Sequence, residues 1–173
     1  PAFTAPALEW VENCLSLTRA ENPDLAALIF EQAEGAMIAV EVAAARRGEL
    51  FPHTRHVLSH LHAGGAKVGI ITRNCRAAVR TVFPDMDEYC PLLAREDVPA
   101  PKPDPAHLLA MLTRLRAAPA RSLMVGDHPM DILTGQRAGA KTVAVTCGHA
   151  SYEQLLAAKP NLILAHCGEL LAE

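Results

Sequence analysis

The sequence predicts an α/β protein with a Rossmann-like parallel sheet flanked by helices, together with a small all-helical cap. From residue 51 onward, short apolar runs alternate with amphipathic helical segments, and the runs are apolar at consecutive positions. Such runs are typical of parallel strands that helices cover on both faces. Before residue 51 only helical spacing is present. We therefore expect a helical cap over 1–50 and a Rossmann-like core over 51–173.

The first 50 residues contain signals for two helices. Thr4 is placed to cap a helix from Ala5 to about Leu17. Asn22 followed by Pro23 is a favourable N-cap and first-position pair for a second helix. Apolar residues then recur at helical spacing in an alanine-rich stretch that continues past Gly35, and Arg46, Arg47 and Gly48 end the region.

The core should contain strands and helices in alternation. Pro129 suits a first helical turn, and Gly139 suits the position after a last one. Strands are expected at 68–72, 91–94, 122–127, 142–146 and 161–164. Helices are expected at 54–65, 75–82, 105–117, 129–138 and 151–158, with a short one at the C-terminus.

Composition excludes several classes of partner and compartment. A net charge of −3 and a pI near 6.3 offer no basic surface for nucleic acid or an anionic membrane. No apolar run approaches the roughly 18–20 residues of a membrane span. The five cysteines are scattered without a C-x-x-C pair, which favours a reducing, cytoplasmic location.

Polar residues follow the predicted strands at the edge where parallel sheets bind ligands. Asp127 follows one strand, and Asp131 falls in the first turn of the next helix. Two acids that converge at a strand end suggest a hard cation such as Mg²⁺. The alternative is one acid that caps a helix and one ordinary surface acid.

Two further side chains can serve an anionic ligand. Lys102 lies in "APKPDP", where prolines stiffen the loop and can aim a point charge, although an exposed loop lysine is the alternative. Thr72 ends the run "VGIIT". Its hydroxyl and the N–H groups of the following turn can bind a phosphate oxygen, unless Thr72 merely closes a strand.

Histidines form one cluster and one isolated candidate. The cluster, on one helical segment, lacks an acid or cysteine at ligand spacing, so a solvated or half-buried helix face is expected rather than a metal site. Its members are His53, His56, His60 and His62. His128 lies inside the aspartate loop, where it can contact substrate or cap the helix.

A nucleophile is hard to find among these residues. No G-x-S-x-G motif is present. Cys75 begins a helix just after the Thr72 turn, a position where the pKa of its thiol can fall. Cys75 is therefore an alternative nucleophile.

Three segments in order resemble motifs two, three and four of the haloacid dehalogenase superfamily. They are "GIITRN", "PKPDP" and "GDHPMD". The longer stretches "REDVPAPKPDPAHLLAML" and "LMVGDHPMDILTGQRAGAKTVAVT" are similar to its phosphoglycolate-phosphatase-like branch. The resemblance covers about 51–173, and 1–50 resemble that branch's small helical cap, inserted early in the core.

The resemblance implies a Mg²⁺-dependent phosphatase that hydrolyses a small phosphorylated metabolite through an aspartyl-phosphate. It implies that Thr72 hydrogen-bonds the phosphoryl group and that Lys102 offsets charge between nucleophile and phosphate. Asp127 would bind Mg²⁺, with Asp131 as a second ligand, directly or through water. The candidate substrate-binding residues are Arg73, Asn74 and His128.

The chain departs from the family pattern at its first motif, a D-x-D that supplies the nucleophile at the end of a central strand. The only D-x-D here, Asp85–Met86–Asp87, follows Pro84 without an apolar strand. We therefore expect the core over 51–173 to lack its central strand, and the nucleophilic aspartate to lie upstream of Pro1.

Two alternatives to the phosphatase stay open. One is a catalytically inactive relative that binds a phosphorylated ligand or a protein. The presence of Thr72, Lys102, Asp127 and Asp131 argues against it, because an inactive relative need not keep all four. The other is a metal-independent dehalogenase-type hydrolase. The Gly126–Asp127 pair followed by Asp131 favours the metal-using side.

Overall fold

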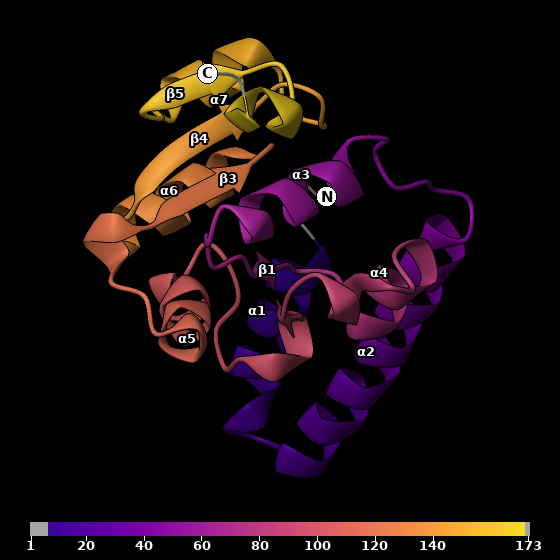
Figure 1. The fold of residues 1–173 in the computed structure, drawn as a ribbon. Coiled ribbons are helices and arrows are strands. Elements are labelled where there is room, and N and C mark those ends of the chain that lie inside the picture. The colour runs from indigo at the N-terminus through magenta and orange to yellow at the C-terminus, as the bar shows by residue number, and fades with distance from the viewer. Residues whose placement is uncertain (1–6, 172–173) are drawn as a thin grey trace.

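The fold is seen in a computed structural model that describes residues 7–171 (Figure 1). Thr4, the predicted N-cap residue of the first helix, and the predicted start of that helix at Ala5 lie outside these residues. The first described helix is α1, Ala7–Arg19. Within residues 7–171, no helix combines the length and the apolarity needed to cross a membrane.

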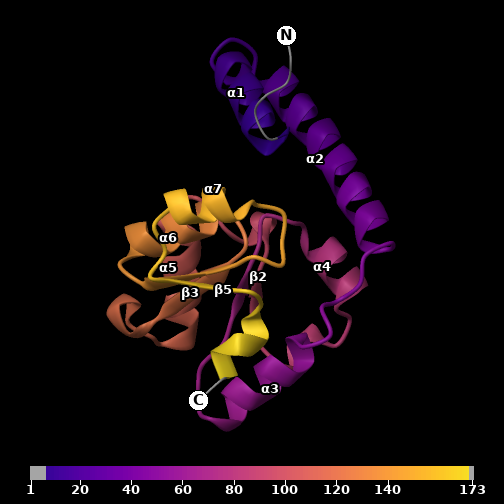
Figure 2. The ribbon, with the colours of Figure 1, turned by 90° about the horizontal axis from the view of Figure 1, so that it is seen from above.

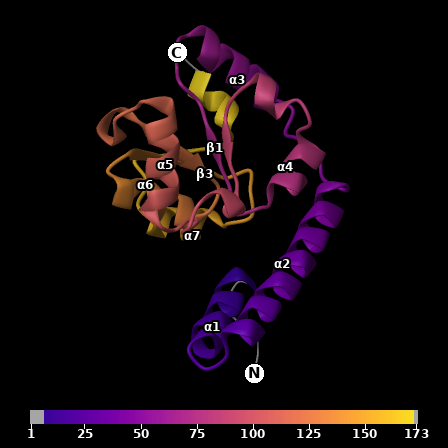
Figure 3. The same cartoon turned by 90° about the horizontal axis from the view of Figure 1, so that it is seen from below.

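The long helix α2, Pro23–Ala45, confirms the second predicted helix. The side-chain oxygen of Asn22 accepts the N–H of Leu25 at 3.0 Å, and Pro23 occupies the first helical position. Helices α1 and α2 pack through a small apolar cluster that includes Leu15 and Ala26. The two helices extend to one side of the core, and the C-terminal part of α2 reaches the helix α4 (Figures 2 and 3).

The strands are all parallel and form two sheets. One sheet contains β3 (Leu123–Gly126), β4 (Lys141–Val145) and β5 (Leu162–Leu164), in that order. The other pairs β1 (Ile70–Ile71) with β2 (Leu92–Leu93). All five strands fall within or next to the predicted runs, but β1 and β2 are shorter than expected.

The remaining helices flank these strands, which confirms the predicted fold class. They are α3 (Thr54–Ala63), α4 (Arg76–Val82), α5 (Pro105–Leu115), α6 (Pro129–Ala138) and α7 (Tyr152–Ala157). Figure 2 shows α5, α6 and α7 on one side of the strands, with α3 and the C-terminal turn on the other. As predicted, Gly139 closes α6 in the left-handed conformation, at φ 77°.

The two sheets meet beneath α5 without sharing a ladder. Ile71 of β1 packs against an apolar cluster of Leu108, Leu112, Met124 and Ala138, which belong to α5, β3 and α6. Within the described part of the chain, no backbone hydrogen bonds pair β1 with β3. Each of these two strands therefore has one edge that faces no ladder partner.

Candidate active site

The turn between β3 and α6 holds the two predicted aspartates. His128 caps α6: its Nδ1 accepts the N–H of Met130 at 3.1 Å, and its own N–H donates to Asp131 Oδ2 at 3.2 Å. This reciprocal capping box satisfies backbone donors that a helix start leaves free. His128 thus caps the helix, which was one of its two predicted roles.

Lys102 reaches the same turn from its proline-rich loop. Its Nζ lies 2.6 Å from Asp131 Oδ1, and the two side chains are only 12% and 5% exposed. A carboxylate this buried requires a cation and hydrogen bonds, and Lys102 and His128 provide both. Gly126 leaves room for the pair, since a Cβ there would lie 2.3 Å from Asp131 Oδ2.

Asp127 is the more accessible acid, with its side chain 41% exposed. Its Oδ2 accepts the N–H of His149 at 3.1 Å, from the loop after β4. A Cβ on Gly148 would overlap this carboxylate, at 1.9 Å from Oδ2. The contact between this loop and Asp127 was missed at the sequence level, where Gly148 was its only signal.

Asp127 and Asp131 are the carboxylates that a Mg²⁺ ion at this turn would use as ligands. Mg²⁺ prefers oxygen ligands and is commonly bound through one or two carboxylates. Asp127 offers the exposed oxygens, whereas both oxygens of Asp131 already accept hydrogen bonds. Residues 7–171 contain no group of three His, Cys, Asp or Glu side chains arranged to hold a metal. The assignment of Asp127 and Asp131 as ligands stays a prediction.

A buried histidine fixes the Lys102 loop, and sequence analysis missed it. His107 is fully buried in α5; its Nδ1 accepts the N–H of Lys102 at 3.2 Å, and its Nε2 lies 3.0 Å from the carbonyl oxygen of Leu93. Burial lowers the pKa of His107, so the ring is neutral and donates through Nε2. The only signal was a polar residue on the apolar side of an amphipathic helix.

The turn after β1 carries the predicted phosphate-binding residues. The N–H of Thr72 donates to the carbonyl of Leu93 at 3.1 Å, and Thr72 Oγ1 accepts the N–H of Asn74 at 3.1 Å. Arg73 Nη1 lies 3.4 Å from the sulfur of Met130, in the first turn of α6. Arg73 therefore joins the Thr72 turn to the aspartate turn.

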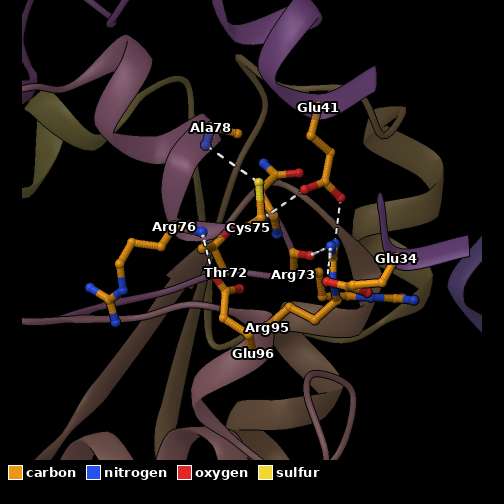
Figure 4. A network of polar contacts seen from close by, with 10 residues as sticks. Glu34, Glu41, Thr72, Arg73, Cys75, Arg76, Ala78, Arg95 and Glu96 are labelled. Carbon is orange, nitrogen blue, oxygen red and sulfur yellow. Dashed lines mark hydrogen bonds and ion pairs between the residues drawn. The ribbon is translucent and has the colours of Figure 1, made fainter. Parts of the chain in front are cut away.

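Arg95, just after β2, links this turn to the helix α2 (Figure 4). Its side chain is 7% exposed and pairs with Glu34 and Glu41 of α2. A groove of about 430 Å³ lies beside it. The residues that line the groove are Ala36, Met37, Val40, Glu41, Arg73, Asn74 and Arg95.

The structure corrects the interpretation of Cys75 as an alternative nucleophile. Cys75 is the N-cap of α4, with its sulfur 3.4 Å from the N–H of Ala78, and it is 1% exposed. Burial raises the pKa of its thiol instead of lowering it, so the unreactive protonated form is favoured.

The histidine cluster behaves as the expected solvated helix face. His53, His56, His60 and His62 are all exposed. His53 stacks on His166 with ring centroids 4.5 Å apart, and His56 tilts toward His60 at 6.1 Å. These contacts are between rings and assemble no ligand set with an acid or a cysteine among the described residues.

Fold and site together define a parallel α/β protein that gathers a lysine–aspartate pair, an accessible aspartate and a threonine turn at its strand ends. Residues 30–145 match the model of the family described as haloacid dehalogenase-like hydrolase. The chain belongs to this family, in agreement with the resemblance seen in its motifs.

Relatives with assigned names include two kinds of phosphatase. The chain is 31% identical to a phosphoglycolate phosphatase of Yersinia pseudotuberculosis over 71% of its own length and 54% of the relative's. It is 38% identical to the pyrophosphatase PpaX of Bacillus cereus over 66% of its length and 54% of that protein. The chain thus spans about half the length of the curated relatives it matches.

Solved structures agree with this placement. A haloacid dehalogenase-like hydrolase from Bacteroides fragilis superposes with a TM-score of 0.66 at 32% identity, over 70% of this chain and 60% of that one. CbbY from Rhodobacter sphaeroides, solved in complex with phosphate, superposes at 0.67 over 84% of this chain and 65% of that chain. At 20% identity, the second likeness concerns the fold alone.

Proposed function

We propose that the protein is a Mg²⁺-dependent phosphatase that hydrolyses a small phosphomonoester. The observation that carries the proposal is the buried Lys102–Asp131 pair beside the accessible carboxylate of Asp127. Phosphoryl transfer depends mainly on positioning and on cations that neutralise oxygen charge. The phosphatase names of the two curated relatives support the same reaction class.

Each side chain has a role that its contacts permit. The hydroxyl of Thr72 accepts the N–H of Asn74, so its own hydrogen stays available to a phosphoryl oxygen. Lys102 is held through its N–H by His107 and through its ammonium by Asp131, which fixes a positive charge at the strand ends. Asp127 would hold Mg²⁺, which would supply further positive charge to the phosphoryl oxygens.

The nucleophile in this proposal is an aspartate that forms an aspartyl-phosphate, which water then hydrolyses. We place it on a strand between β1 and β3, in a segment outside these 173 residues. Both strands lie against α5 yet share no ladder within residues 7–171, and a strand between them would supply the missing pairing. We also propose a cytoplasmic location for the protein. All five cysteines are free thiols, which agrees with a reducing compartment.

The test is phosphate release from small phosphomonoesters by the whole protein, with Mg²⁺ and with EDTA. Asp127→Asn should lower turnover by about 100-fold or more, the usual loss when a group that stabilises developing charge is removed. The matched control is Asp24→Asn, at an exposed position in the first turn of α2, which should keep full activity.

Three outcomes separate the alternatives. Equal turnover in Asp127→Asn and wild type would contradict the proposed site. Phosphate release that survives EDTA would contradict the dependence on Mg²⁺, whereas turnover of a halogenated substrate in EDTA, without phosphate release, would support a metal-independent dehalogenase-type hydrolase. A protein that shows no turnover but binds a phosphorylated ligand would support the inactive relative.

A further inference from the structure

We propose that Glu41 of the cap helix is a positioning residue, which acts through Arg95 and the Cys75 N–H to set the conformation of the turn that carries Thr72. Docking of α2 and formation of the phosphate-binding turn would then be one coupled event. The inference rests on the proposed function for the role of Thr72, and it goes beyond that function in assigning a task to the cap.

The turn has few backbone partners within the sheet, because β1 ends at Ile71. The N–H of Thr72 still donates to the carbonyl of Leu93 in β2. Beyond Thr72, side chains and the backbone N–H of Arg95 satisfy the polar groups of the turn. The N–H of Cys75 donates to Glu41 Oε2 at 2.7 Å, and the N–H of Arg76 donates to Glu96 Oε1 at 2.8 Å. Glu41 therefore holds the turn directly from the cap.

Arg95 holds the same turn from the other side. Its Nη1 donates to the carbonyl of Arg73 at 2.9 Å, and its backbone N–H donates to the carbonyl of Asn74 at 3.3 Å. Since Nη1 also pairs with Glu41, one carboxylate contacts both the turn and the side chain that braces it (Figure 4).

Charge and burial make this contact sensitive to the position of the cap. Arg95 is 7% exposed, while Glu34 and Glu41 are each 20% exposed. Both acids come from α2 and lie two helical turns apart, so they share one face of the helix. If α2 moved away, the buried guanidinium would lose both carboxylates and the turn would lose a hydrogen-bond acceptor.

The groove beside Arg95 explains why α2 and the Thr72 turn should be coupled. Ala36, Met37 and Val40 of α2 line it together with Arg73 and Asn74 of the turn. The part of a substrate that extends from its phosphate toward the cap would contact both. A cap that is docked by the Glu41–Arg95 contact would hold substrate and the Thr72 turn in one geometry.

The experiment compares Glu41→Ala and Glu41→Gln with Glu31→Ala, a control at an exposed position of the same helix. Hydrogen exchange of the 72–77 backbone should be about tenfold faster in Glu41→Ala, the factor expected from loss of one charge-assisted hydrogen bond. kcat for phosphate release should fall by a similar factor. Glu41→Gln, which keeps an acceptor but no charge, should lie between Glu41→Ala and wild type.

Two results would overturn the inference. One is equal exchange over 72–77 in Glu41→Ala and Glu31→Ala, which would refute the coupling whether or not the protein hydrolyses phosphate. The other is faster exchange with unchanged kcat, which would refute a role in catalysis. Absence of phosphate release by the wild type would refute the proposed function instead, and the exchange data would still decide the coupling. Melting curves verify that every variant is folded.

Discussion

Replacement of Lys102 by methionine should destabilise the fold as well as the site. Methionine keeps most of the aliphatic stem but removes the ammonium 2.6 Å from Asp131. The carboxylate that remains is only 5% exposed. Loss of one partner from a buried ion pair typically costs about 3–5 kcal/mol, because it leaves an uncompensated charge.

In the variant, the carboxylate of Asp131 still accepts one hydrogen bond, from the backbone N–H of His128 at 3.2 Å. Lys102 is also slightly exposed, at 12%, so water reaches the pair more readily than in a fully enclosed site. Both facts place the expected loss at the lower end of the range, about 3 kcal/mol in the free energy of unfolding.

The assay is urea unfolding at pH 7 of a double-mutant cycle that combines Lys102→Met with Asp131→Asn. Asparagine can still accept from His128 but carries no charge, so the double variant should recover about 2 kcal/mol of the loss. If Lys102→Met costs less than about 1 kcal/mol and Asp131→Asn recovers nothing, the two residues do not form a buried charge pair.

Two further predictions concern the groups around this pair. The pKa of His107 is lowered from 6.5, so its neutral form stabilises the fold above that pH, and this contribution should be lost as pH falls below 6.5 toward the lowered pKa. Unfolding free energies at pH 7.5 and 5.5 should then differ more in wild type than in His107→Gln; equal pH dependence would contradict this. Gly126→Ala should cost about 2 kcal/mol, because its Cβ would lie 2.4 Å from the Cβ of Asp131. Gly35→Ala is the control: it meets nothing within 4 Å in α2 and should stabilise the fold by about 0.5–1 kcal/mol, so equal costs would refute the steric argument.

Local signals made the helix ends and the aspartate turn predictable. Asn22, Pro23 and Gly139 act through neighbours within a few positions, so the sequence contains the whole interaction. Asp127 and Asp131 were found in the same way, from a strand end and a helix start. The division of the chain into a cap and a core near residue 50 stays a prediction.

Long-range contacts were not predictable because no local pattern encodes them. Lys102 and Asp131 are 29 positions apart, and Arg95 and Glu41 are 54 apart. The prediction for the Cys75 thiol was wrong for a related reason. Its place at a helix start suggested a lower thiol pKa, but the direction depends on burial, which only packing determines.

The two-residue length of β1 and β2 follows from pairing rather than propensity. The run at 68–72 is apolar enough for a longer strand, yet β1 pairs only with β2 among the described residues. A strand with neighbours on both sides is held by twice as many ladder bonds, so its ends fray less. Sequence pattern identified the position of these strands but not their extent.

The open edges of β1 and β3 have a consequence for any preparation of residues 7–171 alone. Each edge presents a row of backbone donors and acceptors in parallel geometry, and such rows template the addition of strands from other molecules. Association would rise with protein concentration and would compete with a strand offered in the correct register. A synthetic peptide of that strand would pair with both open edges and so keep the protein in solution.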